Sequence, residues 1–191
     1  MATSTTFSLP RWLGIGILLE ILLFGYCYLT FDATGEVFRH AARYSGRLSL
    51  LIYLLAAGYF VYTQGRRTDT GWENLRVITL TFSILHLIHF GFLATNVVLN
   101  DIELIPVKLA GGALGYGMIV AYPWVMRWIK RNWMHLIYFS YVGLVMAVTY
   151  LARIKGDFPG ATPGPVHYAG ISLAALAVVA VLAAAALKPS K

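Results

Sequence analysis

Long apolar runs separated by short polar segments recur along the whole chain. A helix that crosses the hydrocarbon layer needs roughly 20 apolar residues, and backbone groups in lipid are satisfied only within helices or closed barrels. The pattern therefore predicts an all-α integral membrane protein, a six-transmembrane-helix bundle whose short connections make consecutive helices antiparallel neighbours. The expected spans form a single transmembrane domain, residues 1–191, and cover residues 12–31, 47–64, 75–97, 107–126, 133–152 and 166–187.

The composition agrees with this class of protein. Of the 191 residues, 59% are hydrophobic and 12% are charged, which lies outside the usual range of soluble globular domains. The formal charge of +7 comes mostly from arginine and lysine at the span ends, as expected beside a lipid surface. Because these residues never form a run with interleaved aromatics, nucleic-acid binding is not expected. The single cysteine, Cys27, lies inside the first span and excludes a disulfide framework.

Basic residues near the span ends also predict an orientation. Cytoplasmic ends carry an excess of lysine and arginine, and an inside N-terminus places nine basic residues on that side against six on the other. We therefore expect both termini on the cytoplasmic side of a bacterial inner (cytoplasmic) membrane. The inner residues are Arg11, Arg66, Arg67, Arg76, Arg127, Lys130, Arg131, Lys188 and Lys191, and the outer ones are Arg39, Arg43, Arg47, Lys108, Arg153 and Lys155.

The connection between the first two spans, residues 32–47, is long enough for a short surface helix. Its apolar residues, among them Val37 and Ala41, could lie in the membrane interface. His40 would then face water or lipid headgroups. This segment is expected to be separate from the second span.

The third span carries the main candidate chemistry. His86 lies about halfway along residues 75–97, and His89 follows three residues later on the same side of a helix. Ionisable groups at such depth are costly and are commonly functional. Thr79 and Ser83 continue the polar side, so a buried stripe of polar packing groups is the alternative.

The first span holds a second ionisable group, Glu20, near its middle. Glu20 has two possible roles. The carboxyl group could partner a histidine or relay protons, or it could hydrogen-bond across a helix interface as a packing element.

Two further spans add features that a cofactor site could use. Gly111 and Gly115 lie four residues apart in the fourth span, which favours close approach of a neighbouring helix and would also accommodate a flat macrocycle. His135 lies near the inner end of the fifth span, with Tyr138 and Phe139 on its side of the helix.

Histidines on two different membrane helices are a common way to hold heme b, because each imidazole supplies one axial nitrogen. His86 or His89 would pair with His135, on helices that run in the same direction. Their depths differ, since His135 is near the start of its span and His86 is well into its own. Either the fifth helix begins earlier than predicted, or the ligands are staggered.

Three places in the chain resemble the ferric-reductase-like transmembrane domain family, which includes the heme subunits of methionine sulfoxide reductases, the NADPH oxidases and the metalloreductases. The resemblance covers roughly residues 43–152. The matching segments are Gly46-Arg47 at the entry of the second span, Arg76 followed by Leu85-His86 in the third, and Trp133-Met134-His135 with Tyr138 in the fifth.

This resemblance implies one heme b in a six-helix bundle. On the heme hypothesis, the ligands to the heme iron are His86 and His135, with His89 as a neighbouring or alternative ligand. Arg47, Arg76 or Arg131 would match the charge of the propionates. The chain departs from two-heme members, which carry a further histidine thirteen or fourteen residues along each helix. Those positions are Leu99, Asn100, Val148 and Thr149, so a second heme held in that way is not supported.

The expected function is a membrane subunit that relays electrons within or across the bilayer, to or from a partner protein or a quinone. It is at most the electron-transfer subunit of an oxidoreductase, because no glycine-rich nucleotide-binding segment is present and the donor must be separate. The alternative is a cofactor-less structural subunit of a larger membrane complex that retains the scaffold. A third possibility joins Glu20, His86 and His89 as a metal site.

Overall fold

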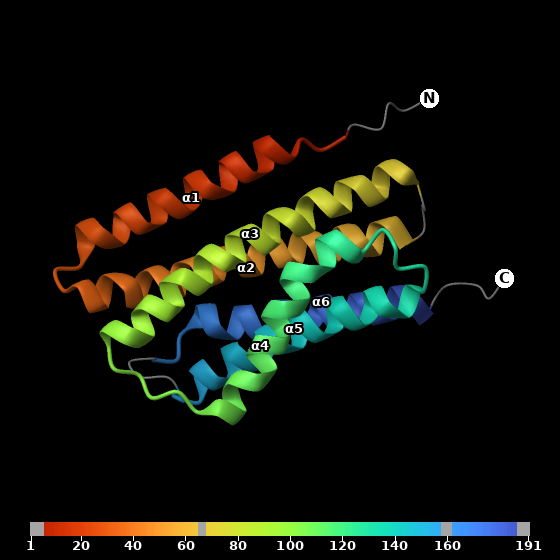
Figure 1. Cartoon of the computed structure of the whole chain (residues 1–191). Helices are drawn as coiled ribbons and strands as arrows, with labels where there is room; N and C mark the ends of the chain where they lie inside the picture. Colours follow the sequence, from red (N-terminus) through yellow and green to blue (C-terminus); the bar gives the residue numbers. More distant parts are fainter. Residues whose placement is uncertain (1–5, 65–67, 158–161, 187–191) are drawn as a thin grey trace.

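The computed structural model describes residues 6–64, 68–157 and 162–186, with the side chains of all of these except Val107 and Lys108. Over these ranges the chain forms a bundle of six α-helices (Figure 1). Five are long and apolar enough to cross a membrane, and the apolar part of the remaining one is the shorter Leu109–Val125. The helices are α1 Leu9–Thr30, α2 Thr34–Gln64, α3 Asp69–Leu99, α4 Pro106–Val125, α5 Asn132–Ile154 and α6 Pro165–Ala186.

Helix α2 lies at the centre of the bundle and packs against α1, α3, α5 and α6. The start of α1 and the end of α6 lie at the same end, which we call the terminal end (Figure 1). Helices α1, α3 and α5 finish at the opposite end, which we call the distal end. Within the described ranges the backbones of α3 and α5 do not approach each other closely, and α4 contacts both helices. Side chains of α3 and α5 meet at the terminal end, where Trp72 lies against His135.

Aromatic side chains fill the interior of the bundle. Tyr122 stacks on Tyr138 with 3.6 Å between ring centroids, and Phe60 stacks on Phe139 at 4.6 Å. Tyr53 is fully buried and donates a hydrogen bond of 2.7 Å to the carbonyl oxygen of Phe139. Buried tyrosines need such a partner, and aromatic pairs add stabilisation beyond the area they bury. This cluster fixes α2, α4 and α5 relative to one another.

The second helix begins at Thr34, although the sequence predicted a start at residue 47 and a separate surface helix before it. The expected surface helix is therefore wrong: the segment is the first part of a continuous 31-residue helix. No proline interrupts it, and Val37 and Ala41 are buried with Cys27 of α1. Those apolar residues pack against protein and do not lie in a lipid interface. His40 likewise stacks on Phe31, with 3.9 Å between ring centroids.

The other predicted elements agree more closely with the structure. Helix α3 is longer than residues 75–97 because Thr68 caps its start by accepting a hydrogen bond from the Gly71 amide. Pro106 is the first residue of α4, where its missing N–H costs nothing. Some residues of the predicted domain, spans and orientation set lie outside the described residues. They are residues 1–5, Arg66, Arg67, Leu187, Lys188 and Lys191.

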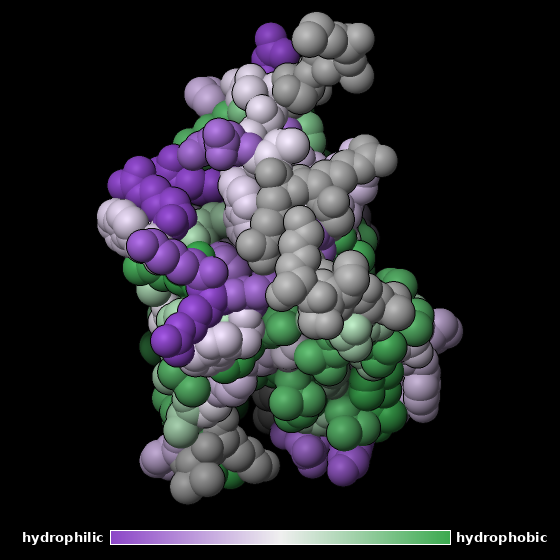
Figure 2. Space-filling view, turned by 90° about the vertical axis from the view of Figure 1, so that its right-hand side faces the viewer, coloured by the Kyte–Doolittle hydropathy of each residue, from purple (hydrophilic) through white to green (hydrophobic). Residues whose placement is uncertain are grey.

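The outer surface of the bundle is strongly apolar. On α1 alone, Ile15, Ile21 and Leu29 are largely exposed, the last at 87%. Figure 2, which faces the terminal end, shows hydrophilic residues gathered there beside a hydrophobic area. Apolar flanks with polar ends are the arrangement that a bilayer requires.

Candidate functional site

The histidines singled out by the sequence lie at two levels of the bundle. The ring of His135 packs against Trp72 near the start of α3, with 4.9 Å between ring centroids. His86 is 14 residues further along the same helix, which corresponds to about 21 Å along its axis. The structure therefore does not bring His86 and His135 together. Since α5 begins at Asn132, as the sequence predicted to within one residue, the two histidines are staggered.

This spacing decides how the residues fit a heme. Two axial ligands must approach the same iron atom, and imidazoles separated by four helical turns cannot do so. His86 and His135 in this arrangement do not fit a single bis-histidine heme. A heme bound at the level of His135 and a heme bound at the level of His86 would therefore occupy two different sites.

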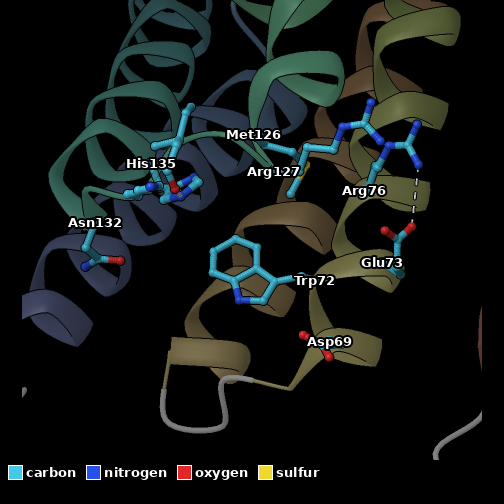
Figure 3. Close-up of a pocket in the computed structure, with 10 residues that line it drawn as sticks. Asp69, Trp72, Glu73, Arg76, Met126, Arg127, Asn132 and His135 are labelled. Atoms are coloured by element: carbon cyan, nitrogen blue, oxygen red, sulfur yellow. Dashed lines mark hydrogen bonds and ion pairs between the residues drawn. The ribbon is translucent and has the colours of Figure 1, made fainter.

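A cavity of about 540 Å³ opens at the terminal end between the start of α3, the end of α4 and the start of α5 (Figure 3). Its volume lies within the roughly 300–1,000 Å³ that is typical of ligand and cofactor sites. In Figure 3, Trp72 lies between His135 on one side and Arg76 and Arg127 on the other. The cavity is lined by Asp69, Trp72, Glu73, Arg76, Met126, Arg127, Ile129, Lys130, Asn132 and His135.

The imidazole of His135 is held in place from α4. Its Nδ1 lies 2.8 Å from the hydroxyl of Tyr122, and its Nε2 lies 3.3 Å from the carbonyl oxygen of Ile129. The Tyr122 ring meets the imidazole edge-on and is itself fixed by its stacking on Tyr138. A hydrogen bond to one ring nitrogen sets the orientation in which the imidazole can act as a ligand. Tyr138, predicted on the same side of the helix as His135, thus supports the imidazole indirectly, by stacking on Tyr122.

Charge in this cavity is mixed, with one more basic than acidic side chain among the lining residues. Arg76, Arg127 and Lys130 line it together with the acidic Asp69 and Glu73. Arg76 is partly neutralised by Glu73, at 3.5 Å on the preceding turn of α3. Surface ion pairs of this kind contribute little energy, about 0–1 kcal/mol. Of the three arginines that the sequence proposed for heme propionates, Arg76 lies in this cavity, while Arg47 and Arg131 do not.

Those two arginines have other surroundings. Arg131 is exposed at the N-terminal end of α5. Arg47 belongs to the distal half of α2 and lies over the ring of Tyr44, 5.1 Å from its centroid. Tyr122 in contrast was missed by the sequence, because nothing marks it apart from its place before Pro123 near the end of a helix.

His86 and His89 form the second level. His86 stacks on Tyr116 of α4 at 4.6 Å, and its centroid is 5.3 Å from that of His89. The Nδ1 atoms of both rings are buried without a recorded hydrogen-bond partner. A side chain at Gly46 would begin only 3.1 Å from the His89 ring, so the glycine lets α2 approach this histidine closely. His89 also hydrogen-bonds to the backbone of Ala42.

The predicted polar stripe and the glycine pair are also found. Thr79 and Ser83 are buried with His86, and the Thr79 hydroxyl donates back to the carbonyl oxygen of Leu75. Gly111 and Gly115 face α5, where Tyr141 donates to the Gly111 carbonyl oxygen at 3.0 Å. The close approach predicted for the fourth span is therefore made to α5.

Glu20 forms the interface hydrogen bond that was one of its two interpretations. Its Oε1 accepts a hydrogen bond of 2.7 Å from the Ser45 hydroxyl of α2, and the residue is 2% exposed. Among the described residues, no group of three or more histidine, cysteine or acidic side chains could hold a metal ion. The structure thus does not assemble Glu20, His86 and His89 as a metal site.

Ser45→Ala is expected to lower the free energy of unfolding by about 1–3 kcal/mol, because it leaves the buried Glu20 carboxyl group without its donor. Ser49→Ala is the matched control, since the hydroxyl of Ser49 is buried one turn away with no recorded partner. Denaturation of the purified protein in detergent micelles measures both. Equal effects of the two changes would show that the hydrogen bond does not contribute.

No protein family, curated protein or solved structure matches this chain.

Proposed function

We propose that this chain is a heme b-binding membrane subunit that relays electrons within or across the bilayer, to or from a partner protein or a quinone. The observation that supports this most is a buried imidazole at the rim of a 540 Å³ cavity that also presents three basic side chains. In this proposal α4 also spans the bilayer, and both termini lie on the cytoplasmic side of a bacterial inner membrane.

The residues of the terminal-end cavity fit one heme with a single histidine ligand. His135 would supply Nε2 as the axial nitrogen, giving up the hydrogen bond of that atom to the Ile129 carbonyl oxygen. Tyr122 would keep the ring oriented through its hydrogen bond to Nδ1. Arg76, Arg127 and Lys130 would bind the two propionates by charge-assisted hydrogen bonds. The flat side chain of Trp72 would pack against the macrocycle. When bound, the heme supplies a one-electron carrier whose potential depends on its axial ligand and surroundings.

The position of this cavity constrains the partners. The starts of α3 and α5, which line it, lie at the terminal end (Figure 1). The proposed site would therefore exchange electrons most directly with a soluble or membrane subunit on that side. A hydrocarbon core of about 30 Å cannot be bridged by one site at its edge. Transfer across the whole membrane therefore requires a second carrier, either a quinone or another redox subunit.

The second candidate function is the cofactor-less structural subunit. One observation favours it: the interior between the two histidine levels is filled by stacked aromatic side chains, including Tyr122 on Tyr138 and Phe60 on Phe139. A bundle whose interior is closely packed in this way needs no cofactor to fill it.

An absorption spectrum of the purified chain, oxidised and then reduced with dithionite, tests the proposal. We expect a Soret band that shifts on reduction, with about one heme per chain by pyridine hemochrome assay. A colourless protein, even after reconstitution with hemin, would overturn the heme assignment. If that protein copurified with a larger membrane complex, the structural function would take its place.

A further inference from the structure

The terminal-end cavity is lined by a second side chain with an atom that can bind iron. Met126 directly follows the last residue of α4 and lines this cavity together with His135. The residue is only 3% exposed, and its Sδ atom lies 3.6 Å from the hydroxyl of Thr79 on α3. The sulfur atom is therefore held inside the bundle, at the wall of the cavity.

Met126 and His135 reach the cavity from different elements of the fold. His135 belongs to the first turn of α5, whereas Met126 caps the end of α4. In Figure 3 both side chains lie above the Trp72 ring, with His135 to the left of Met126. Methionine is unbranched and has three rotatable bonds, so its sulfur can adjust its position without a change in the backbone. Unlike His86, which is about four helical turns away, Met126 lines the same cavity as His135.

The other side chains that line the cavity are less suited to bind iron beside a histidine. Asp69 and Glu73 offer carboxylate oxygens, and the Glu73 carboxylate is paired with Arg76 at 3.5 Å. Lys130 is exposed, and its charge is better matched to a propionate. A thioether sulfur is a soft ligand, and methionine paired with histidine is an established axial ligand set of heme iron in electron carriers. Among the described lining residues, Met126 is the one that carries sulfur.

The number of axial ligands determines which chemistry a heme supplies. Iron with one protein ligand keeps an open position at which dioxygen or carbon monoxide can bind. Iron with two protein ligands has no such position and is suited to electron exchange alone. A methionine ligand in addition raises the reduction potential. A second ligand therefore matches a subunit that relays electrons.

We propose that Met126 supplies the second axial ligand of the heme, opposite His135. The assignment rests on the proposed function and deepens it in two respects. The site would exchange electrons without binding dioxygen. Its raised potential would also make it an acceptor of electrons from a donor of lower potential.

Absorption spectra of the heme-loaded full chain in detergent test this proposal. A bond between ferric iron and a thioether sulfur gives a weak far-red charge-transfer band, which we expect in the oxidised protein. We also expect that the reduced protein does not bind carbon monoxide. Met126→Leu should lose the far-red band and gain carbon monoxide binding, while it retains its heme through His135.

Met134→Leu is the matched control for this substitution. Met134 directly precedes His135, but it is 41% exposed and is not among the described residues that line the cavity. This variant should keep the far-red band and should not bind carbon monoxide. Met126→His provides a second comparison, because it replaces the sulfur with another ligand atom. It should exclude carbon monoxide without the far-red band, and its midpoint potential should be lower.

Heme content by pyridine hemochrome assay distinguishes failure of this assignment from failure of the proposed function. A chain that binds heme but shows no far-red band would overturn the assignment of Met126 and leave the heme proposal standing. The same holds if Met126→Leu changes neither the band nor carbon monoxide binding, or changes them no more than Met134→Leu. A chain that takes up no heme would overturn both.

Discussion

Replacing His135 with alanine is expected to abolish the heme absorbance of the purified chain. The substitution removes the one imidazole among the described residues that line the terminal-end cavity. Loss of a partner that merely orients a ligand typically costs about 10–100-fold in affinity, and loss of the ligand itself costs more. We therefore expect Tyr122→Phe, which keeps the ring stacked on Tyr138 but removes the hydroxyl at 2.8 Å, to give an intermediate loss. Heme content per chain, by pyridine hemochrome assay, measures both.

The matched control for this prediction is His40→Ala, because His40 is a half-buried histidine at the distal end. It should retain the heme content of the unmodified chain. A second comparison, His86→Ala, separates the two histidine levels. If His86→Ala were colourless while His135→Ala kept its heme, the cofactor would belong to the level of His86 and His89.

Gly143→Ala is expected to destabilise the bundle strongly, although it adds only one methyl group. A Cβ atom at Gly143 would lie 2.6 Å from Val178 of α6 and would overlap the hydroxyl of Tyr53. That hydroxyl is already committed to the carbonyl oxygen of Phe139. Overpacking a closed core costs about 1–3 kcal/mol, and displacing Tyr53 from its acceptor adds the cost of a buried unsatisfied hydroxyl. The melting temperature in detergent should fall accordingly.

Gly112→Ala is the control for this substitution, because a Cβ atom there meets nothing within 4 Å. Alanine is favoured over glycine within a helix by about 0.5–1 kcal/mol, so this variant should be as stable as the unmodified chain or slightly more so. Similar losses of stability at the two positions would mean that the contact between α5, α2 and α6 is looser than described.

The sequence predicted the number, order and approximate bounds of the helices, because apolar runs of membrane length dominate its pattern. It failed at residues 34–47, where charged and polar residues alternate with apolar ones in the manner of a surface helix. In the structure this segment is instead part of α2, because its residues Val37 and Ala41 are buried against α1. Packing against protein, more than bilayer thickness, therefore sets the length of the helix in this region. A single sequence does not reveal which neighbour covers an amphipathic face.

For the candidate site, the sequence identified His135, its aromatic stripe and Arg76, all of which the structure places at or beside one cavity. The sequence also indicated that His86 and His135 lie at different depths in the membrane. In the structure the two histidines are about four helical turns apart along the bundle. Tyr122 could not have been found, because its role depends on how the end of α4 packs against α5.

The central place of α2 has a consequence for biosynthesis. Domains and helices form in the order in which the ribosome releases them, so α2 can pair with α1 and α3 well before α5 and α6 have been synthesised. Until then, the hydroxyl of Tyr53 has no access to its acceptor, the carbonyl group of Phe139 on α5, and Phe60 lacks its stacking partner Phe139. Assembly is completed only by the last helices, and a chain that stalls after α4 leaves the Tyr53 hydroxyl without the acceptor that it has in the complete bundle.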